Sequence, residues 1–251
     1  MWTYFILFLS IIVLVGVFLR KAALVHLKKV RAAMQVACKK AVNSPEEEVV
    51  ISKVSKSAKV KIASLLEKAE QLLANGEEGE AIKVFIQALS FDDNNVDVLQ
   101  KLAMLYLQKQ MYSAASALFK QLSDLTKDPL HYSNLGFVLY QQSSLEEARD
   151  AYQKAVDLDP SRPQRFVSLA QVYRSLSQPQ NAIIALTKAI ELDGENIEFL
   201  LLLTELYAEL NNIEEAEIAL RNALEKAPEN EEALNLLKKL QKEKEDKKSG
   251  N

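Results

Sequence analysis

The chain has 251 residues, of which 49% are hydrophobic and 26% are charged, and its formal net charge is −3. Six glycines, six prolines and one cysteine exclude a Gly-rich fold, a disulfide-built fold and an all-cysteine metal site. Residues 1–61 carry 11 basic and 3 acidic side chains (net +8) and the remainder carries 20 and 31 (net −11), an acidic balance that argues against a nucleic-acid groove.

Residues 1–19 form an uncharged apolar run that is long enough to cross a bilayer. At about 1.5 Å per helical residue this run spans roughly 28 Å, close to the hydrocarbon thickness. Aromatic rings favour the membrane interface, and two of them, Trp2 and Tyr4, lie at its start. Basic residues follow its end: Arg20, Lys21, Lys28 and Lys29. We therefore predict a transmembrane helix over 1–19, with these six residues at the membrane interface.

The order of charges around this run predicts how the anchor is oriented. A secretory signal peptide would place its basic residues before the apolar core and a small-residue cleavage site after it. Here the basic residues come second, and the sequence from Phe18 to Lys21 offers no such site. Because basic flanks stay on the cytoplasmic side, we expect an uncleaved single-pass protein with its N-terminus outside and the rest in the cytoplasm.

Residues 20–61 are predicted to be a basic juxtamembrane helix followed by a linker. Apolar and small residues recur every three or four positions from Ala23 to Ala41, which gives one helical stripe. The stripe fits a helix lying on lipid, a simple stalk, or pairing with a second copy. Self-association through the transmembrane or stalk helix therefore stays open. Ser44 and Pro45 indicate a new helix start, and the weakly patterned residues 49–61 fit a linker.

A repeat of 33 or 34 residues dominates the chain from residue 62 onward. Its clearest marker is one alanine in each unit: Ala81, Ala115, Ala148, Ala182 and Ala216. A mostly small residue lies twelve positions earlier in every unit: Ala69, Ala103, Gly136, Ala170 and Thr204. Small residues at this spacing indicate two antiparallel helices that approach closely, and such a pair cannot bury its apolar face alone. The repeat therefore predicts stacked helix pairs.

The third unit carries the pattern most clearly, in the segments 134–140, 146–152 and 157–160 (Asn-Leu-Gly-Phe-Val-Leu-Tyr, Glu-Glu-Ala-Arg-Asp-Ala-Tyr and Asp-Leu-Asp-Pro). On these residues the chain resembles the tetratricopeptide repeat (TPR) family. The resemblance implies an all-α fold: a right-handed solenoid of five helix pairs with a C-terminal capping helix, preceded by the transmembrane helix and a helical stalk. We expect the repeats at 62–95, 96–128, 129–162, 163–196 and 197–230, and the capping helix with a charged tail at 231–251.

In TPR proteins the first helix of each pair lines a concave groove that accepts a peptide or a helix. The resemblance places the partner-binding residues of this chain at Met104, Phe137, Tyr140, Val167, Gln171, Arg174, Leu201 and Glu205. Leu201 and its neighbour Leu202 are also candidates for contact with the terminal helix. The lysine and asparagine clamp by which some family members hold a C-terminal carboxylate is not matched here.

These features predict a membrane-anchored scaffold that binds protein or peptide partners at the cytosolic face. The two histidines are far apart and there is no phosphate-binding loop, so we expect no enzymatic activity, catalytic residue, metal or cofactor. We also expect no nucleic-acid partner. The strongly apolar anchor favours a bacterial inner membrane. The alternatives are a mitochondrial outer-membrane receptor and an envelope-assembly or secretion component with periplasmic repeats.

Overall fold

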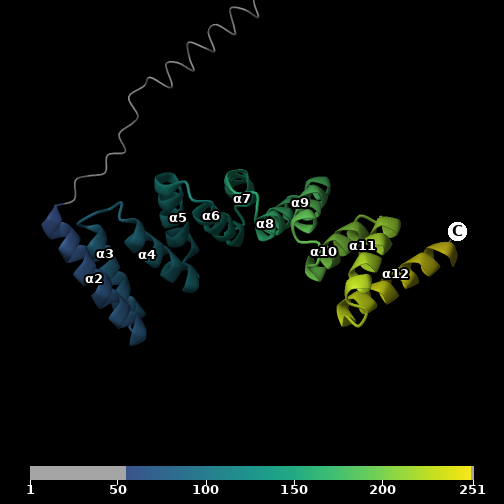
Figure 1. Ribbon diagram of the computed structural model, residues 1–251, viewed down its shortest axis with the longest axis horizontal. Coiled ribbons are helices and arrows are strands. Elements are labelled where there is room, and N and C mark those ends of the chain that lie inside the picture. Colours follow the sequence, from purple (N-terminus) through teal and green to yellow (C-terminus); the bar gives the residue numbers. More distant parts are fainter. Residues whose placement is uncertain (1–54, 250–251) are drawn as a thin grey trace, which may run out of the picture. The chain divides into compact units, whose positions relative to one another are not determined.

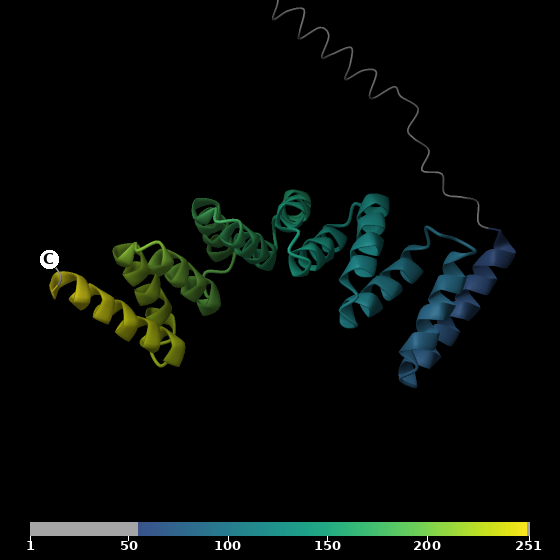
Figure 2. The same cartoon turned by 180° about the vertical axis from the view of Figure 1, so that it is seen from behind.

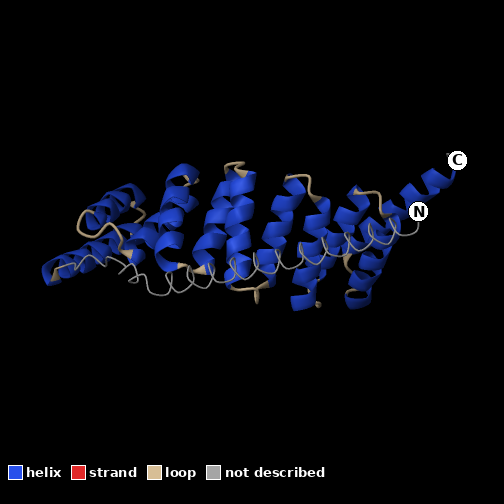
Figure 3. Ribbon diagram, turned by 90° about the horizontal axis from the view of Figure 1, so that it is seen from above, coloured by secondary structure: helices blue, strands red, loops and turns tan. Residues whose placement is uncertain are grey.

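The computed structural model describes residues 55–249, and within this range it contains eleven helices and no strand (Figure 1, Figure 3). The expected transmembrane helix at 1–19 and the segment 20–54 lie outside the described residues. Among the helices that are described, none is both long and apolar enough to cross a membrane.

The helices form five antiparallel pairs and one terminal helix, which succeed one another in chain order in both opposite views (Figure 1, Figure 2). Their bounds are α2 Lys56–Ala74, α3 Glu78–Leu89, α4 Val96–Gln108, α5 Tyr112–Thr126, α6 Pro129–Gln141, α7 Leu145–Leu158, α8 Pro163–Ser175, α9 Pro179–Leu192, α10 Ile197–Glu209, α11 Ile213–Lys226 and α12 Glu231–Ser249.

Polar caps and prolines fix where the helices begin. The side chains of Ser55, Asn95, Asp128 and Asn196 each accept a hydrogen bond from a backbone N–H in the first turn of the following helix. Proline occupies the first helical position of α6, α8 and α9, where its missing N–H has no intrahelical partner to lose. The cap at Ser55 starts α2 at Lys56, so residues 56–61 are helical and not the linker that we expected.

The turn between the two helices of a pair is the same in all five repeats. One residue takes a positive φ in each turn: Gly76, Gln110, Ser143, Ser177 and Asn211. The next residue donates its backbone N–H to the carbonyl oxygen five positions back, as in Met111 to Tyr106 at 2.8 Å. This is the Schellman ending of a helix, and it reverses the chain within three residues. Four of the five turns achieve it without glycine.

Close helix crossings hold each pair together. The marker alanines of the second helices, from Ala81 to Ala216, are all fully buried. The tightest crossing is in the third pair, where a Cβ added to Gly136 would lie 2.8 Å from the ring of Tyr152. That is too close for a side chain of any size, which explains why this repeat has glycine where three others have alanine.

The apolar core runs from α4 to α12 because neighbouring pairs share it. One cluster joins α4 to α8, a second joins α8 to α11, and a third joins α10 and α11 to α12. In the third cluster Ala233 and Leu240 of α12 pack against Leu201 of α10 and Leu220 of α11. Helix α12 therefore closes the apolar end of the last repeat, as a terminal helix must in a stacked array.

Candidate protein-binding surface

The first helices of the five pairs (α2, α4, α6, α8 and α10) contribute exposed side chains to one surface, which we call the first-helix face. Polar contacts join successive members of it. Lys101 of α4 lies 2.8 Å from Glu70 of α2, and the Tyr140 hydroxyl of α6 lies 3.1 Å from Ser175 of α8. Arg174 of α8 forms ion pairs with two glutamates of α10. These contacts link α2 with α4, α6 with α8, and α8 with α10.

The middle of the first-helix face is apolar. Met104 of α4 is 47% exposed and Phe137 of α6 is 42% exposed, and the two occupy the same place in consecutive repeats. Leu107 and Tyr140, one turn further along these helices, are half-buried. Large apolar side chains that stay in water at the centre of a polar surface are typical of protein-binding anchors. Met104 and Phe137 are thus open to solvent, and the role of Met104, Phe137 and Tyr140 in binding a partner stays a prediction.

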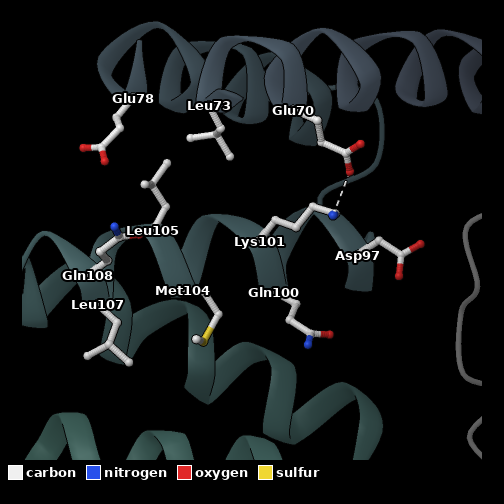
Figure 4. Close-up of a pocket in the computed structure, with 10 residues that line it drawn as sticks. All are labelled: Glu70, Leu73, Glu78, Asp97, Gln100, Lys101, Met104, Leu105, Leu107 and Gln108. Atoms are coloured by element: carbon white, nitrogen blue, oxygen red, sulfur yellow. Dashed lines mark ion pairs between the residues drawn. The ribbon is translucent and has the colours of Figure 1, made fainter. Parts of the chain in front are cut away.

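A cavity of about 820 Å³ opens beside this centre, between α2 and α4 (Figure 4). Its lining comes from Glu70, Leu73, Glu78, Asp97, Gln100, Lys101, Met104, Leu105, Leu107 and Gln108. Lys101 reaches across to Glu70, while Met104 and Gln100 point away from α2 (Figure 4). Three carboxylates and one ammonium group line the cavity, so its local charge is negative.

At the other end of the face Arg174 is held by acidic side chains. Its Nη1 lies 3.7 Å from Glu205, and its Nε donates to Glu209 at 2.9 Å. One guanidinium is therefore shared between these two carboxylates. Gln171, one turn before it, is exposed and Glu205 is half-buried.

Two residues assigned to the groove belong to the core instead. Val167 is 3% exposed and packs with Phe199 and Leu203 of the next repeat. Leu201 is 5% exposed and lies in the cluster with Ala233 and Leu240 of α12. The assignment of Val167 was wrong, and for Leu201 the alternative of contact with the terminal helix holds, because a following helix covers each of them.

A second cavity on this face, of about 480 Å³, lies between the first halves of α6 and α8. Its wall includes Arg165, which is 8% exposed and donates to the Asp159 carboxylate at 2.5 Å and to its carbonyl oxygen at 2.8 Å. Hydrogen bonds from Ser161 and Arg165 hold the pKa of Asp159 well below its usual range. Burial raises the pKa of Tyr152, in the same wall, to about 12.

Sequence reasoning missed the pair formed by Arg165 and Asp159. The sequence did hold a signal. In three other repeats the position equivalent to Arg165 is occupied by Val98, His131 and Phe199, and all four side chains are buried. An arginine at a buried place requires an acceptor, and Asp159 at the preceding repeat boundary supplies it. The described residues contain no group of three or more His, Cys, Asp or Glu side chains placed to hold a metal ion.

Comparison with known proteins supports the repeat architecture. A tetratricopeptide repeat family profile matches residues 72–135 and 173–240, which are 64 and 68 residues and together just over half of the 251. A second TPR repeat profile matches residues 136–177. No curated protein matches the sequence.

Solved structures with the same fold include MamA, at 24% identity and a TM-score of 0.62 over 66% of this chain and 91% of that one. YrrB, described as a TPR protein with an unusual peptide-binding site, has 20% identity and a TM-score of 0.60 over 69% and 90%. PilF of Pseudomonas aeruginosa has 20% identity and a TM-score of 0.56 over 77% and 88%. At these identities the likeness concerns the fold. The chain belongs to the tetratricopeptide repeat family.

Proposed function

We propose that the chain is a protein-binding scaffold whose first-helix face is the binding site. The observation that carries this proposal is that Met104 and Phe137, at the same position of consecutive repeats, are both exposed on the first-helix face. Covering two large apolar side chains removes apolar surface from water at about 25 cal/mol per Å², which makes the centre the natural anchor for a partner. The peptide-binding site of YrrB, a relative by fold, is consistent with this use of the repeats.

We further propose that residues 1–19 anchor the scaffold in a membrane, with the repeats in the cytoplasm and a bacterial inner membrane as the site. The support is the sequence alone: nineteen uncharged residues, aromatic side chains at one end and Arg20 and Lys21 at the other. In this arrangement the anchor concentrates partners at the membrane surface.

Site-specific photo-crosslinking in native membranes tests the binding face. A photoreactive residue placed at the exposed Gln100 or Gln171 should form adducts with a protein partner, and Phe137→Asp should abolish them. The same probe at Thr187, an exposed residue of the second helix α9, serves as the matched control. Adducts that form equally well at Thr187, or that persist in the Phe137→Asp variant, would remove the first-helix face from consideration.

Protease treatment tests the anchor and its orientation. In intact spheroplasts the repeats should resist an added protease, and permeabilised cells should lose them. The protein should stay in the membrane fraction after carbonate extraction, and deletion of residues 1–19 should release it. Digestion in intact spheroplasts would favour periplasmic repeats, and extraction of the full chain by carbonate would contradict a membrane-spanning anchor.

A further inference from the structure

Arg165 is a charged side chain at a core position, and only part of its guanidinium is engaged. The residue is 8% exposed, and its Nη1 donates to both the carboxylate and the carbonyl oxygen of Asp159. No described residue accepts a hydrogen bond from its Nε or Nη2. Every buried side-chain nitrogen and oxygen in the described part of the chain has a partner, so these two atoms must be in contact with solvent.

Solvent reaches Arg165 through the cavity of about 480 Å³ between α6 and α8, whose wall it forms in part. Asp159 fixes the guanidinium there, and Ser161 holds Asp159 in turn. The backbone N–H and the hydroxyl of Ser161 donate to one Asp159 carboxylate oxygen at 3.1 and 2.5 Å. A guanidinium is planar and rigid, so fixing Nη1 on Asp159 also fixes the other nitrogens. The Nε–H and Nη2–H bonds, which point the same way, form its open edge.

Arg174 shows how this fold uses such an edge when a carboxylate is beside it. Its Nη1 lies 3.7 Å from Glu205, and its Nε and Nη2 both donate to Glu209, from Nε at 2.9 Å. One guanidinium thus binds two carboxylates, one through Nη1 and one through the Nε–Nη2 edge. In Arg165, Nη1 engages Asp159 in the same way, and no described residue takes the part of Glu209.

The charges around the cavity favour an anion at this edge. Its two carboxylates are already engaged, since Asp159 holds Arg165 and Asp128 caps α6. Asp128 accepts a hydrogen bond from the Leu130 N–H at 2.7 Å. The positive groups are less fully used, because Arg162 is exposed and approaches Asp159 only to 3.9 Å. The first turn of α8 also has no side-chain cap, and the positive end of a helix stabilises a nearby negative charge.

We propose that this cavity binds an aspartate or glutamate side chain of the partner, which accepts two parallel hydrogen bonds from the Nε–Nη2 edge of Arg165. The inference rests on the proposed function, and it names the chemical class of the partner segment. A carboxylate fits because its two oxygens match the spacing of the two N–H groups. A lysine or arginine of the partner would meet a guanidinium that repels it and that can only donate hydrogen bonds.

Two apolar side chains of α6 indicate where the rest of the segment lies. Leu130, which lines the cavity, is 49% exposed, and Phe137 is 42% exposed. Seven residues of helix separate them, which is about 10.5 Å along the axis. An extended chain advances about 3.3 Å per residue. A segment that runs along α6 would therefore have a large apolar residue about three positions from its acidic residue.

Four capped nine-residue peptides test the inference against the full-length chain in detergent micelles. Each has phenylalanine at its centre and a Gly/Ser/Ala background, with one glutamate or glutamine three positions before or after the phenylalanine. The chain is labelled with nitrogen-15 in its arginines alone, and lysine variants of the other arginines assign the Nε–H signal of Arg165 by elimination. One glutamate peptide should shift that signal and bind about tenfold more tightly than its glutamine counterpart. The Nε–H signals of Arg149 and Arg221, on the second helices α7 and α11, should not move.

Arg165→Lys separates the hydrogen-bonding edge from the charge. Lysine keeps the positive charge but lacks the planar fork, so the preference for glutamate should fall to about twofold or less. Arg221→Lys, the same exchange at an exposed residue of α11, is the matched control and should leave the preference unchanged. Thermal unfolding checks that both variants fold, and the titration of the unsubstituted chain is decisive without them.

The outcomes separate this inference from the function on which it rests. Equal affinity of the glutamate and glutamine peptides, an Arg165 signal that neither glutamate peptide moves, or a preference that persists in Arg165→Lys would overturn the carboxylate site. If Phe137→Asp abolished the binding of all four peptides in that case, the first-helix face would still stand. A glutamate preference that Arg165→Lys removes, in peptides whose affinity Phe137→Asp leaves unchanged, would keep the carboxylate site and overturn the proposed anchor.

Discussion

The two ends of the solenoid use the same repeat position in opposite ways. In the second repeat Gln100 is exposed and lines an open cavity between α2 and α4. In the fourth and fifth repeats the equivalent Val167 and Leu201 are buried under later helices. The junction of α2 with α4 is bridged by a lysine and a glutamate, and the junction of α10 with α12 is filled with aliphatic side chains. A repeat position is thus a surface site or a core site according to whether the next helix in the stack covers it.

Alanine substitution of the two equivalent residues should show the largest difference in the free energy of unfolding. Leu201→Ala should lower the free energy of unfolding by about 3 kcal/mol, because it leaves a cavity under α12. Gln100→Ala should change it by less than about 0.5 kcal/mol, as for an exposed site. Urea unfolding monitored by circular dichroism measures both. Equal effects would mean that the two ends do not differ as described.

The closest crossing, in the third pair, offers the next largest effect. Gly136→Ala should destabilise the protein by about 2 kcal/mol, because the new methyl group would lie 2.8 Å from the Tyr152 ring. Tyr152→Leu in the same chain should restore part of the loss, since the fourth repeat combines Ala170 with Leu186 at these places. Thermal unfolding of both variants is the measurement. A neutral Gly136→Ala would contradict the close approach of Gly136 to the Tyr152 ring.

High pH tests the burial of Tyr152 in the third helix pair without a substitution at the crossing. The folded pKa of Tyr152, about 12, lies above the unfolded value of about 10, because burial disfavours the phenolate. Its contribution to stability is therefore complete below pH 10 and is lost as the pH rises to 12. At pH 11 the loss should be about 1.4 kcal/mol relative to Tyr152→Phe. If the free energy of unfolding fell equally with pH in both proteins, ionisation of Tyr152 would not destabilise the folded state.

The turns give the smallest expected effect and compare the two ends again. Gln110→Gly should stabilise the second repeat by about 1 kcal/mol, because a residue with a Cβ is strained at φ 57°. Asn211→Gly should gain less, since asparagine adopts this conformation more readily. Denaturant midpoints measure both changes. A larger gain at Asn211 would contradict the account of these turns.

Much of the fold could be predicted from the sequence, because close helix crossings require small residues and these recur at a constant spacing. Exposure at single positions was harder. Met104 and Phe137 are exposed as expected, whereas Val167 and Leu201 are buried. The family resemblance identifies the face of a helix but does not say whether the next helix covers it. The residue types held a clue, since Gln100 is polar at the position where Val167 and Leu201 are apolar.

Polar pairs across repeats could not be predicted, because they depend on side-chain reach and not on periodicity. Arg174 illustrates this: the resemblance placed it among the partner-binding residues, and in the structure it pairs with Glu205 and Glu209. The expected transmembrane helix at 1–19 lies outside the described residues and stays a prediction.

The packing of α12 on Leu201 and Leu220 has a practical consequence for anyone who shortens or fuses this protein. A chain that ends before Ala233 would expose the aliphatic side chains of α10 and α11 that α12 covers. It would therefore be prone to aggregate in storage or to misassemble during expression. A reporter or affinity tag is better joined after Ser249, because α12 then still covers the apolar side chains of α10 and α11. Grafting further repeats onto the array would require moving α12 to the new terminus.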